Sequence, residues 1–183
     1  MILAGLLPAA SKLRSVNLED SGLCSGGMSG FHLLAESLPK TKIRRLNLSS
    51  NGLGDAGAHT LAAVLRKCAI THLYLAGNEL CGVNMLGAGT HVSGGLQALC
   101  KEVAQTQIEL IDLSFNSIRE TGGAHVTAML DVEDETPYLS VLDVQSNELP
   151  QVTLENLMIA SQAAQWSNLK LTLEEEGESE DEL

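Results

Sequence analysis

The residue types best suited to catalysis or metal binding, histidine and cysteine, are scattered through this chain rather than grouped. The histidines are His32, His59, His72, His91 and His125, and the cysteines are Cys24, Cys68, Cys81 and Cys100. Zinc sites normally combine three or four such ligands in closely spaced pairs, and the sequence holds no cluster of that kind. We therefore expect no metal and no cofactor. The cysteines are expected to be reduced, mostly buried thiols, as is usual in intracellular proteins.

Paired carboxylates are the next candidates for chemistry, because two of them can act together as general acid and base. Asp112 and Asp143 each stand in a short segment of alternating apolar and polar residues, which predicts an exposed position on a sheet. An open sheet is a poor place to exclude water from a reaction. The chain also has no glycine-rich loop followed by lysine that would hold a phosphate. The sequence therefore predicts that the protein is not an enzyme.

Four asparagines recur at one position of a repeated pattern. They are Asn51, Asn78, Asn116 and Asn147, and each stands three residues after an apolar residue that closes a strand-like segment. A carboxamide both donates and accepts hydrogen bonds, so asparagines stacked in successive turns can satisfy backbone groups that lack a sheet partner. We expect these four residues to be structural. We also expect the inner Asn78 to contribute more stability than Asn147, which lies near the end of the pattern.

The elements that must position these residues are short strands, each followed by a helix. Apolar residues recur in five segments that begin at Leu13, Ile43, Ile70, Ile108 and Leu139, with start-to-start spacings of 30, 27, 38 and 31 residues. A sixth segment contains Leu169 and Leu171, with Glu174 at the asparagine position. After Asn51 the apolar period changes from that of a strand to that of a helix. A unit this short can bury both apolar faces only by stacking on copies of itself.

Glycine follows the asparagine at a fixed distance in two repeats. Gly57, Leu61 and Leu65 follow Asn51 at the same offsets at which Gly122, Val126 and Leu130 follow Asn116. This pattern resembles the ribonuclease-inhibitor-like subfamily of leucine-rich repeat proteins. The resemblance implies an α/β fold: a right-handed solenoid, or horseshoe, of about six repeats, with a parallel sheet on the concave face and helices on the convex face. Asp55 and Thr121 are expected to cap the helices just ahead of their first residues.

The chain divides into three parts. Residues 1–12 are expected to be an N-terminal capping helix or the remnant of a preceding repeat, 13–173 the leucine-rich repeats, and 174–183 an acidic, disordered tail. The tail carries seven acids and no base, so the rest of the chain has a net charge of −12 + 7 = −5. Residues 82–95 interrupt the period with about ten additional residues, and long loops of this kind are often functional.

A partner-binding site is expected on the concave face, where the residues that flank the buried strand positions are exposed. The expected contact residues are Arg45, Asn47, His72, Tyr74, Asp112, Asp143 and Gln145. One column is expected to run through Asn17, Asn47, Tyr74, Asp112, Asp143 and Lys170, with neighbours about 4.8 Å apart. Tyr74 is an aromatic residue of the kind that anchors protein interfaces. Phe115, in contrast, is expected to fill the interior of a turn.

These features favour a non-enzymatic scaffold that binds a protein partner through the concave face, and the aspartates suit a partner with a basic patch. Two alternatives remain open. Ribonuclease-inhibitor-like repeats followed by an acidic segment also resemble the Ran GTPase-activating proteins, which would make the chain a regulator of a small GTPase. That family acts through an arginine and asparagines near the strand ends, whereas the strand-end loops of this chain contain no arginine. In the second alternative, the acidic tail itself binds basic proteins.

Net charge and hydropathy limit the remaining partners. A net charge of −12 at pH 7 repels nucleic acid. No segment approaches the roughly 20 apolar residues of a membrane span, and no signal peptide is evident at the N-terminus. We therefore expect a cytoplasmic or nuclear protein, with its oligomeric state left open.

Overall fold

The strands of the protein form one parallel sheet whose order follows the chain. The computed structural model describes residues 2–84, 86–131, 138–163, 166 and 168–173, so the acidic tail lies outside the described residues. The strands are β1 (Ser15–Asn17), β2 (Arg45–Asn47), β3 (His72–Tyr74), β4 (Leu110–Asp112), β5 (Val141–Asp143) and β6 (Lys170–Thr172). Each strand pairs in parallel with the next, in the order β1-β2-β3-β4-β5-β6.

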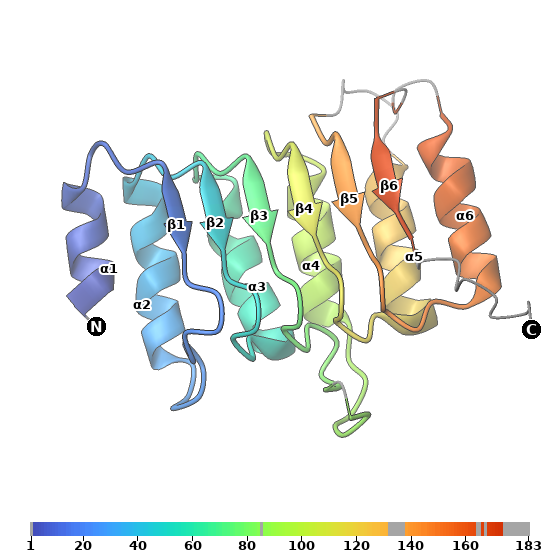
Figure 1. Ribbon diagram of the computed structural model, residues 1–183, viewed down its shortest axis with the longest axis horizontal. Helices are drawn as coiled ribbons and strands as arrows, with labels where there is room; N and C mark the ends of the chain where they lie inside the picture. The colour runs from blue at the N-terminus through green and yellow to red at the C-terminus, as the bar shows by residue number, and fades with distance from the viewer. Residues whose placement is uncertain (1, 85, 132–137, 164–165, 167, 174–183) are drawn as a thin grey trace, which may run out of the picture.

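Helices alternate with the strands and cover one face of the sheet (Figure 1). The α-helices of the described residues are α1 (Ile2–Leu6), α2 (Ser29–Ser37), α3 (Gly54–Leu65), α4 (Gly94–Val103), α5 (Arg119–Leu130) and α6 (Gln151–Ser161). Short 3-10 helices, η1 (Leu7–Ala9) and η2 (Leu38–Lys40), extend α1 and α2. The predicted α/β solenoid of about six stacked repeats is confirmed. The other face of the sheet carries no helix in Figure 1, and we call it the open sheet face.

The core lies between the sheet and the helices and consists mostly of aliphatic side chains. The central residues of the four inner strands, Leu46, Leu73, Ile111 and Leu142, are fully buried, and Leu61 of α3 packs into the same cluster. Strand side chains alternate between the two faces of a sheet. Because the central residues of the four inner strands are buried against the helices, their two neighbours lie on the open sheet face. The pairing register places the corresponding residues of β1 and β6 on the same face.

Helices α3 and α5 begin without a side-chain cap, so the prediction for Asp55 and Thr121 was wrong. Both residues lie inside the first turn of their helices, because α3 begins at Gly54 and α5 at Arg119. Neither residue caps its own helix, and the residues before both helices make no side-chain capping bond.

The following repeat supplies the missing partner for each helix start. The N–H of Gly54 donates to the backbone carbonyl of Asn78 over 2.8 Å, and that of Arg119 donates to the carbonyl of Asn147 over 2.9 Å. A helix begins with N–H groups that have no partner within the helix. In this protein one of them is satisfied by the next turn of the solenoid, so a side-chain cap at that position is unnecessary.

Asp55 stabilises the neighbouring helix instead of its own. Its Oδ1 accepts the N–H of Gly95, in the first turn of α4, over 2.6 Å. A Cβ atom at Gly95 would overlap the backbone carbonyl of Asp55. A close approach is also present at Gly57, because a Cβ there would lie 2.6 Å from Cβ of Leu53. Glycine at these two positions therefore permits the tight packing of the helix starts.

The register of the sixth strand differs from the prediction. Asp143 of β5 pairs with Thr172, and Val141 pairs with Lys170. The expected column of exposed residues therefore ends at Thr172, and Lys170 belongs to the neighbouring column. A shift of this kind matters because it changes which side chain follows Asp143 across the sheet.

The cause of this error is a weak apolar pattern in the last repeat. Leu171 pairs with the central residue of β5, Leu142, so Leu171 rather than Leu169 is the central residue of β6. By the spacing of the other repeats, the asparagine position then falls at Glu176 instead of Glu174. Both glutamates lie outside the described residues.

The 82–95 insertion projects from the edge at which the strands end (Figure 1). Val83 and Gly89 form an isolated antiparallel bridge within it. The loop is joined to the next repeat by His91, whose Nε2 lies 3.1 Å from the carbonyl oxygen of Ile118. A functional role for this insertion stays a prediction.

Candidate functional site

The four asparagines of the repeated pattern lie buried in the turns that follow the strands, at most 4% exposed. They are Asn51, Asn78, Asn116 and Asn147, and we call them the asparagine ladder. Each Nδ2 group donates to three backbone carbonyls. Each Oδ1 atom accepts the N–H at the equivalent position of the preceding repeat. The polar atoms of the ladder are thus engaged with the backbone, which makes it a structural feature rather than a ligand site.

The open sheet face carries two rows of side chains. The first row is Ser15, Arg45, His72, Leu110, Val141 and Lys170, and the second row is Asn17, Asn47, Tyr74, Asp112, Asp143 and Thr172. Members of a row are register partners on adjacent strands, which lie about 4.8 Å apart. Six of the seven predicted contact residues stand in these rows. The seventh, Gln145, lies two residues beyond Asp143 on the same repeat.

Most of the second row also has a local structural role. Oδ1 of Asn17, Asn47, Asp112 and Asp143 each accepts the N–H of the residue two positions later, over 2.9–3.0 Å. This bond closes the turn at the end of the strand. Tyr74 is the exception between Asn47 and Asp112, because a phenol cannot reach its own backbone in this way. The turn that follows β3 therefore forms without any contribution from the Tyr74 side chain.

Asp112 and Asp143 place two carboxylates on adjacent strands. The two residues are register partners, and both are half-buried. Burial raises the pKa of Asp143, and the negative charge of Asp112 raises it further, while the Gln145 N–H and Lys170 act in the opposite direction. Ser114 donates to Asp112 through both its N–H and its hydroxyl group. Burial and the neighbouring like charge therefore both destabilise the ionised form of Asp143.

The first row supplies a basic end to the open sheet face. Arg45 is exposed, and His72 beside it is half-buried, with Nδ1 2.9 Å from Oγ1 of Thr71. In the second row, the side chain of Asn47 donates through Nδ2 to Oε2 of Glu19 over 3.0 Å. The face thus changes from basic and amide side chains over β2 to carboxylates over β4 and β5.

The prediction that Phe115 fills the interior of its turn was wrong. Its side chain is 46% exposed, and its backbone has a φ of 57°. The equivalent positions in the other repeats hold Ser50, Gly77 and Ser146, which also have positive φ values. A position that takes serine and glycine in its sister repeats points to solvent, and this comparison could have identified Phe115 as exposed. Phe115 is thus a second surface aromatic residue, in the turn that follows β4, one repeat from Tyr74.

Metal-holding clusters, free thiols and membrane-spanning helices can be assessed over the described residues. In that part of the chain no group of three or more His, Cys, Asp or Glu side chains could hold a metal ion. All four cysteines are free, and burial raises the pKa of Cys68 to about 11 and those of Cys81 and Cys100 to about 12. None of the helices that the structure describes is long and apolar enough to cross a membrane.

Comparison with known proteins identifies the repeat. Residues 40–62 match the family model described as Leucine Rich repeat. The chain is 30% identical over 151 residues to the mouse ribonuclease inhibitor, an alignment that covers 81% of this chain and 30% of the relative. It is 28% identical over 130 residues to the Tonsoku-like protein of zebrafish, covering 68% of this chain and 8% of the relative. The chain therefore spans less than a third of the length of either relative.

Proposed function

We propose that this chain, which is a leucine-rich repeat protein of the ribonuclease-inhibitor-like type, is a non-enzymatic scaffold that binds a protein partner across its open sheet face. Its relative from mouse carries the name of an inhibitor of ribonuclease, and inhibition of an enzyme by a protein requires a binding surface. The proposed partner surface runs along the second row over β3, β4 and β5. No catalytic step and no cofactor is part of this function.

Tyr74 is the observation that carries the proposal. The neighbouring residues of its row close the turns at the ends of their strands, whereas its phenol has no such role. Tyr74 is half-buried on the open sheet face. Surface tyrosines are frequent energetic centres of protein interfaces, because they bury a large area with few rotatable bonds. Phe115, 46% exposed in the turn after β4, adds a second surface aromatic residue in the next repeat.

The charges beside Tyr74 favour a partner with a basic group. Asp112 and Asp143 are adjacent like charges, and a lysine or arginine placed over them would relieve their repulsion. Complementary charges of this kind contribute more to specificity and association rate than to affinity. The four free thiols also support a reducing compartment, the cytoplasm or the nucleus.

A matched pair of tyrosine variants tests the proposal. The chain has two tyrosines, and Tyr138, 56% exposed just before β5, lies outside both rows of the open sheet face. Proteins captured on the immobilised full chain would be identified, and the best captured one purified and titrated against Tyr74→Ala and Tyr138→Ala. Tyr74→Ala should weaken binding by about 2 kcal/mol or more, while Tyr138→Ala should not.

The contribution of the aspartates is tested with salt. Asp112→Asn should weaken the same complex mainly at low ionic strength, because exposed charges are screened as salt rises. Undiminished binding by a Tyr74→Ala/Asp143→Asn double variant would place the site elsewhere, with residues 82–95 as the next surface to test.

A further inference from the structure

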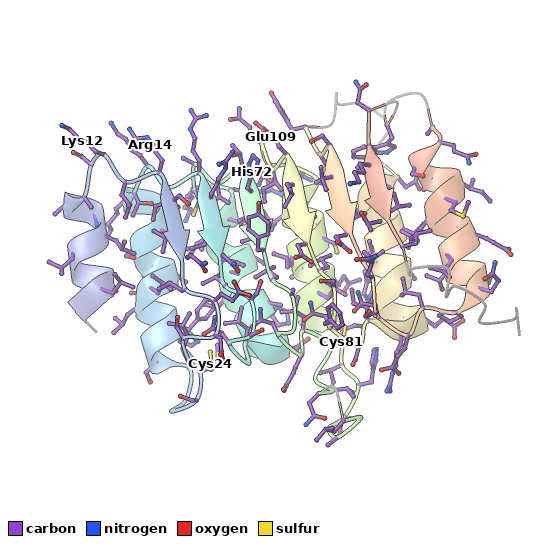
Figure 2. The ribbon with its side chains drawn as sticks, in the orientation of Figure 1. Lys12, Arg14, Cys24, His72, Cys81 and Glu109 are labelled. Carbon is purple, nitrogen blue, oxygen red and sulfur yellow. The ribbon has the colours of Figure 1, made fainter. Side chains whose placement is uncertain are left out.

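The edge at which the strands begin carries a cluster of basic side chains at β1 and β2. It consists of Lys12, Arg14, Lys42, Arg44 and Arg45, which are five of the chain's 11 lysines and arginines, and we call it the basic edge. All five side chains are exposed. Figure 2 shows Lys12 and Arg14 at this edge, with His72 and Glu109 farther along it. The cluster stands out in a chain whose net charge is −12.

The fold brings these charges together from two repeats. Arg14 and Arg44 immediately precede β1 and β2, and the N–H of Arg44 donates to the carbonyl of Arg14 over 2.8 Å. The equivalent position before β4 is Glu109. The sign of the charge at this position therefore reverses along the edge, which confines the basic cluster to the first two repeats.

No carboxylate neutralises the basic edge within the described residues. The ion pairs there are His59–Asp55, Arg66–Glu102 and Arg119–Glu148, and none includes a member of the cluster. Arg14 instead donates through Nη1 to the backbone carbonyls of Ser11 and Leu13. Five like charges at one edge repel one another, and an acidic ligand would remove that repulsion.

We propose that the basic edge binds the acidic segment 174–183 of a second copy of this chain. The segment is EEEGESEDEL, which has seven acids and no base. It is thus the part of the sequence whose charge best complements the basic edge. Charge-assisted hydrogen bonds between carboxylates and guanidinium or ammonium groups form the contact.

Geometry favours a contact with a second copy over a contact within the same molecule. The segment follows β6, whose end lies at the opposite edge of the sheet, and β2 is four strand spacings, or about 19 Å, away. Nine extended residues from Leu173 reach at most about 30 Å, so only the last acids could arrive. On the way they would pass Asp143 and Asp112, which repel them. A segment from a neighbouring molecule is not limited by this reach and does not have to pass the two aspartates.

Two copies can exchange their acidic segments reciprocally. Each molecule has one basic edge and one segment 174–183, so a pair related by a twofold axis satisfies both contacts and leaves neither open. The second contact then forms within an existing complex, which strengthens association without new chemistry. The resulting dimer depends on salt, because its contacts are solvent-exposed charges.

Nucleic acid is a poorer occupant of the basic edge. The chain outside 174–183 still has a net charge of −5, so its overall field repels a long polyanion. Proteins that bind single strands usually add aromatic side chains on which bases stack, and the five residues of the basic edge include none.

The test uses two full-length variants that should complement each other. The edge variant carries Lys42→Glu and Arg44→Glu and keeps its acidic segment. The segment variant carries glutamine or asparagine at the seven acidic positions of 174–183 and keeps its basic edge. Sedimentation equilibrium at about 20 mM ionic strength would measure association. Lys101→Glu/Lys170→Glu is the control, because it changes the net charge equally in repeats beyond β3.

The wild-type chain and the control should dimerise, and each variant alone should be monomeric. An equimolar mixture of the two variants should form a heterodimer through the one contact it can make, with a weaker affinity than the wild-type dimer. Raising the ionic strength to about 300 mM should weaken wild-type dimerisation by about tenfold or more. A monomeric wild-type chain at low salt overturns the proposal, as does a mixture that stays monomeric while circular dichroism shows both variants folded. Binding of a single-stranded oligonucleotide that the edge variant loses and the segment variant keeps would assign the edge to nucleic acid instead.

Discussion

Removing single amides from the asparagine ladder should produce losses that follow the hydrogen-bond pattern rather than the position in the array. Asn78→Ala deletes donors to the carbonyls of Leu48, Leu75 and Ala76. Two of these oxygens keep another donor, because Nδ2 of Asn51 also reaches Leu48 and Nδ2 of Asn116 also reaches Leu75. The carbonyl of Ala76 still accepts the backbone N–H of Ser50 in the preceding repeat.

The groups that lose their partner are therefore the N–H groups that Oδ1 of Asn78 accepts. These belong to Asn51, at 3.0 Å, and Leu53, at 3.4 Å. A buried donor left without an acceptor costs about 1–3 kcal/mol. Because the second bond is long, we expect Asn78→Ala to reduce the free energy of unfolding by about 2–4 kcal/mol.

Asn147→Ala should reduce the free energy of unfolding by at least as much as Asn78→Ala. The sequence alone predicted a larger loss for Asn78. Its Oδ1 accepts the N–H groups of Asn116 and Ile118, the same pattern as at Asn78. In addition, the carbonyl of Val144 accepts only the Nδ2 group of Asn147 among the described residues. Among the described residues, the outer change thus leaves one more buried acceptor without a donor.

Urea unfolding followed by circular dichroism measures both losses. With a denaturant slope of about 1–3 kcal/mol per molar, both midpoints should fall by about 1–2 M. Asn47→Ala is the control, because its side chain lies on the open sheet face and closes one turn with a single backbone bond. Midpoints of the Asn78 and Asn147 variants no lower than that of the control would refute the stabilising role assigned to the ladder.

Two further predictions concern ionisable side chains. Asp143→Asn should slightly raise the thermal midpoint at pH 7. The raised pKa of Asp143 means that its charged form destabilises the fold above that pKa, so the gain should shrink as pH falls and the wild-type carboxyl becomes protonated; a gain independent of pH would contradict this cause. Alkylation at pH 8 followed by mass spectrometry should modify Cys24 first. Cys81 and Cys100, buried and with pKa values raised to about 12, should react at least about 100-fold more slowly than in urea, and similar rates in both states would show that these sites open readily.

The repeat phase could be predicted because it depends on burial. Residues such as Leu46, Leu73 and Ile111 are fully buried, and a shift by one residue would expose them. The last repeat has a weaker pattern, in which Leu169 and Leu171 fit two registers equally well. Only its pairing with β5 resolves which of the two is central.

Two of the errors made from sequence arise from contacts between repeats. The helix starts could not be predicted, since the N–H of Gly54 finds its acceptor in Asn78 of the next repeat. The basic edge was missed because Lys12 and Arg44 are far apart in sequence and meet only when β1 and β2 pair. Phe115 was misplaced because an aromatic residue was assumed to be buried, although its position holds Ser50 in a sister repeat.

The bonds that join the starts of α3 and α5 to the next asparagine also bear on how the protein is made. The chain emerges from the ribosome from its N-terminus, and domains generally fold in that order. The N–H groups of Asn51 and Gly54 both donate to Asn78, which is translated 27 residues after Asn51. Neither group has this acceptor until Asn78 has been synthesised. A repeat of this protein therefore closes only when its successor has left the exit tunnel, so the newest repeat on a growing chain stays incomplete throughout synthesis.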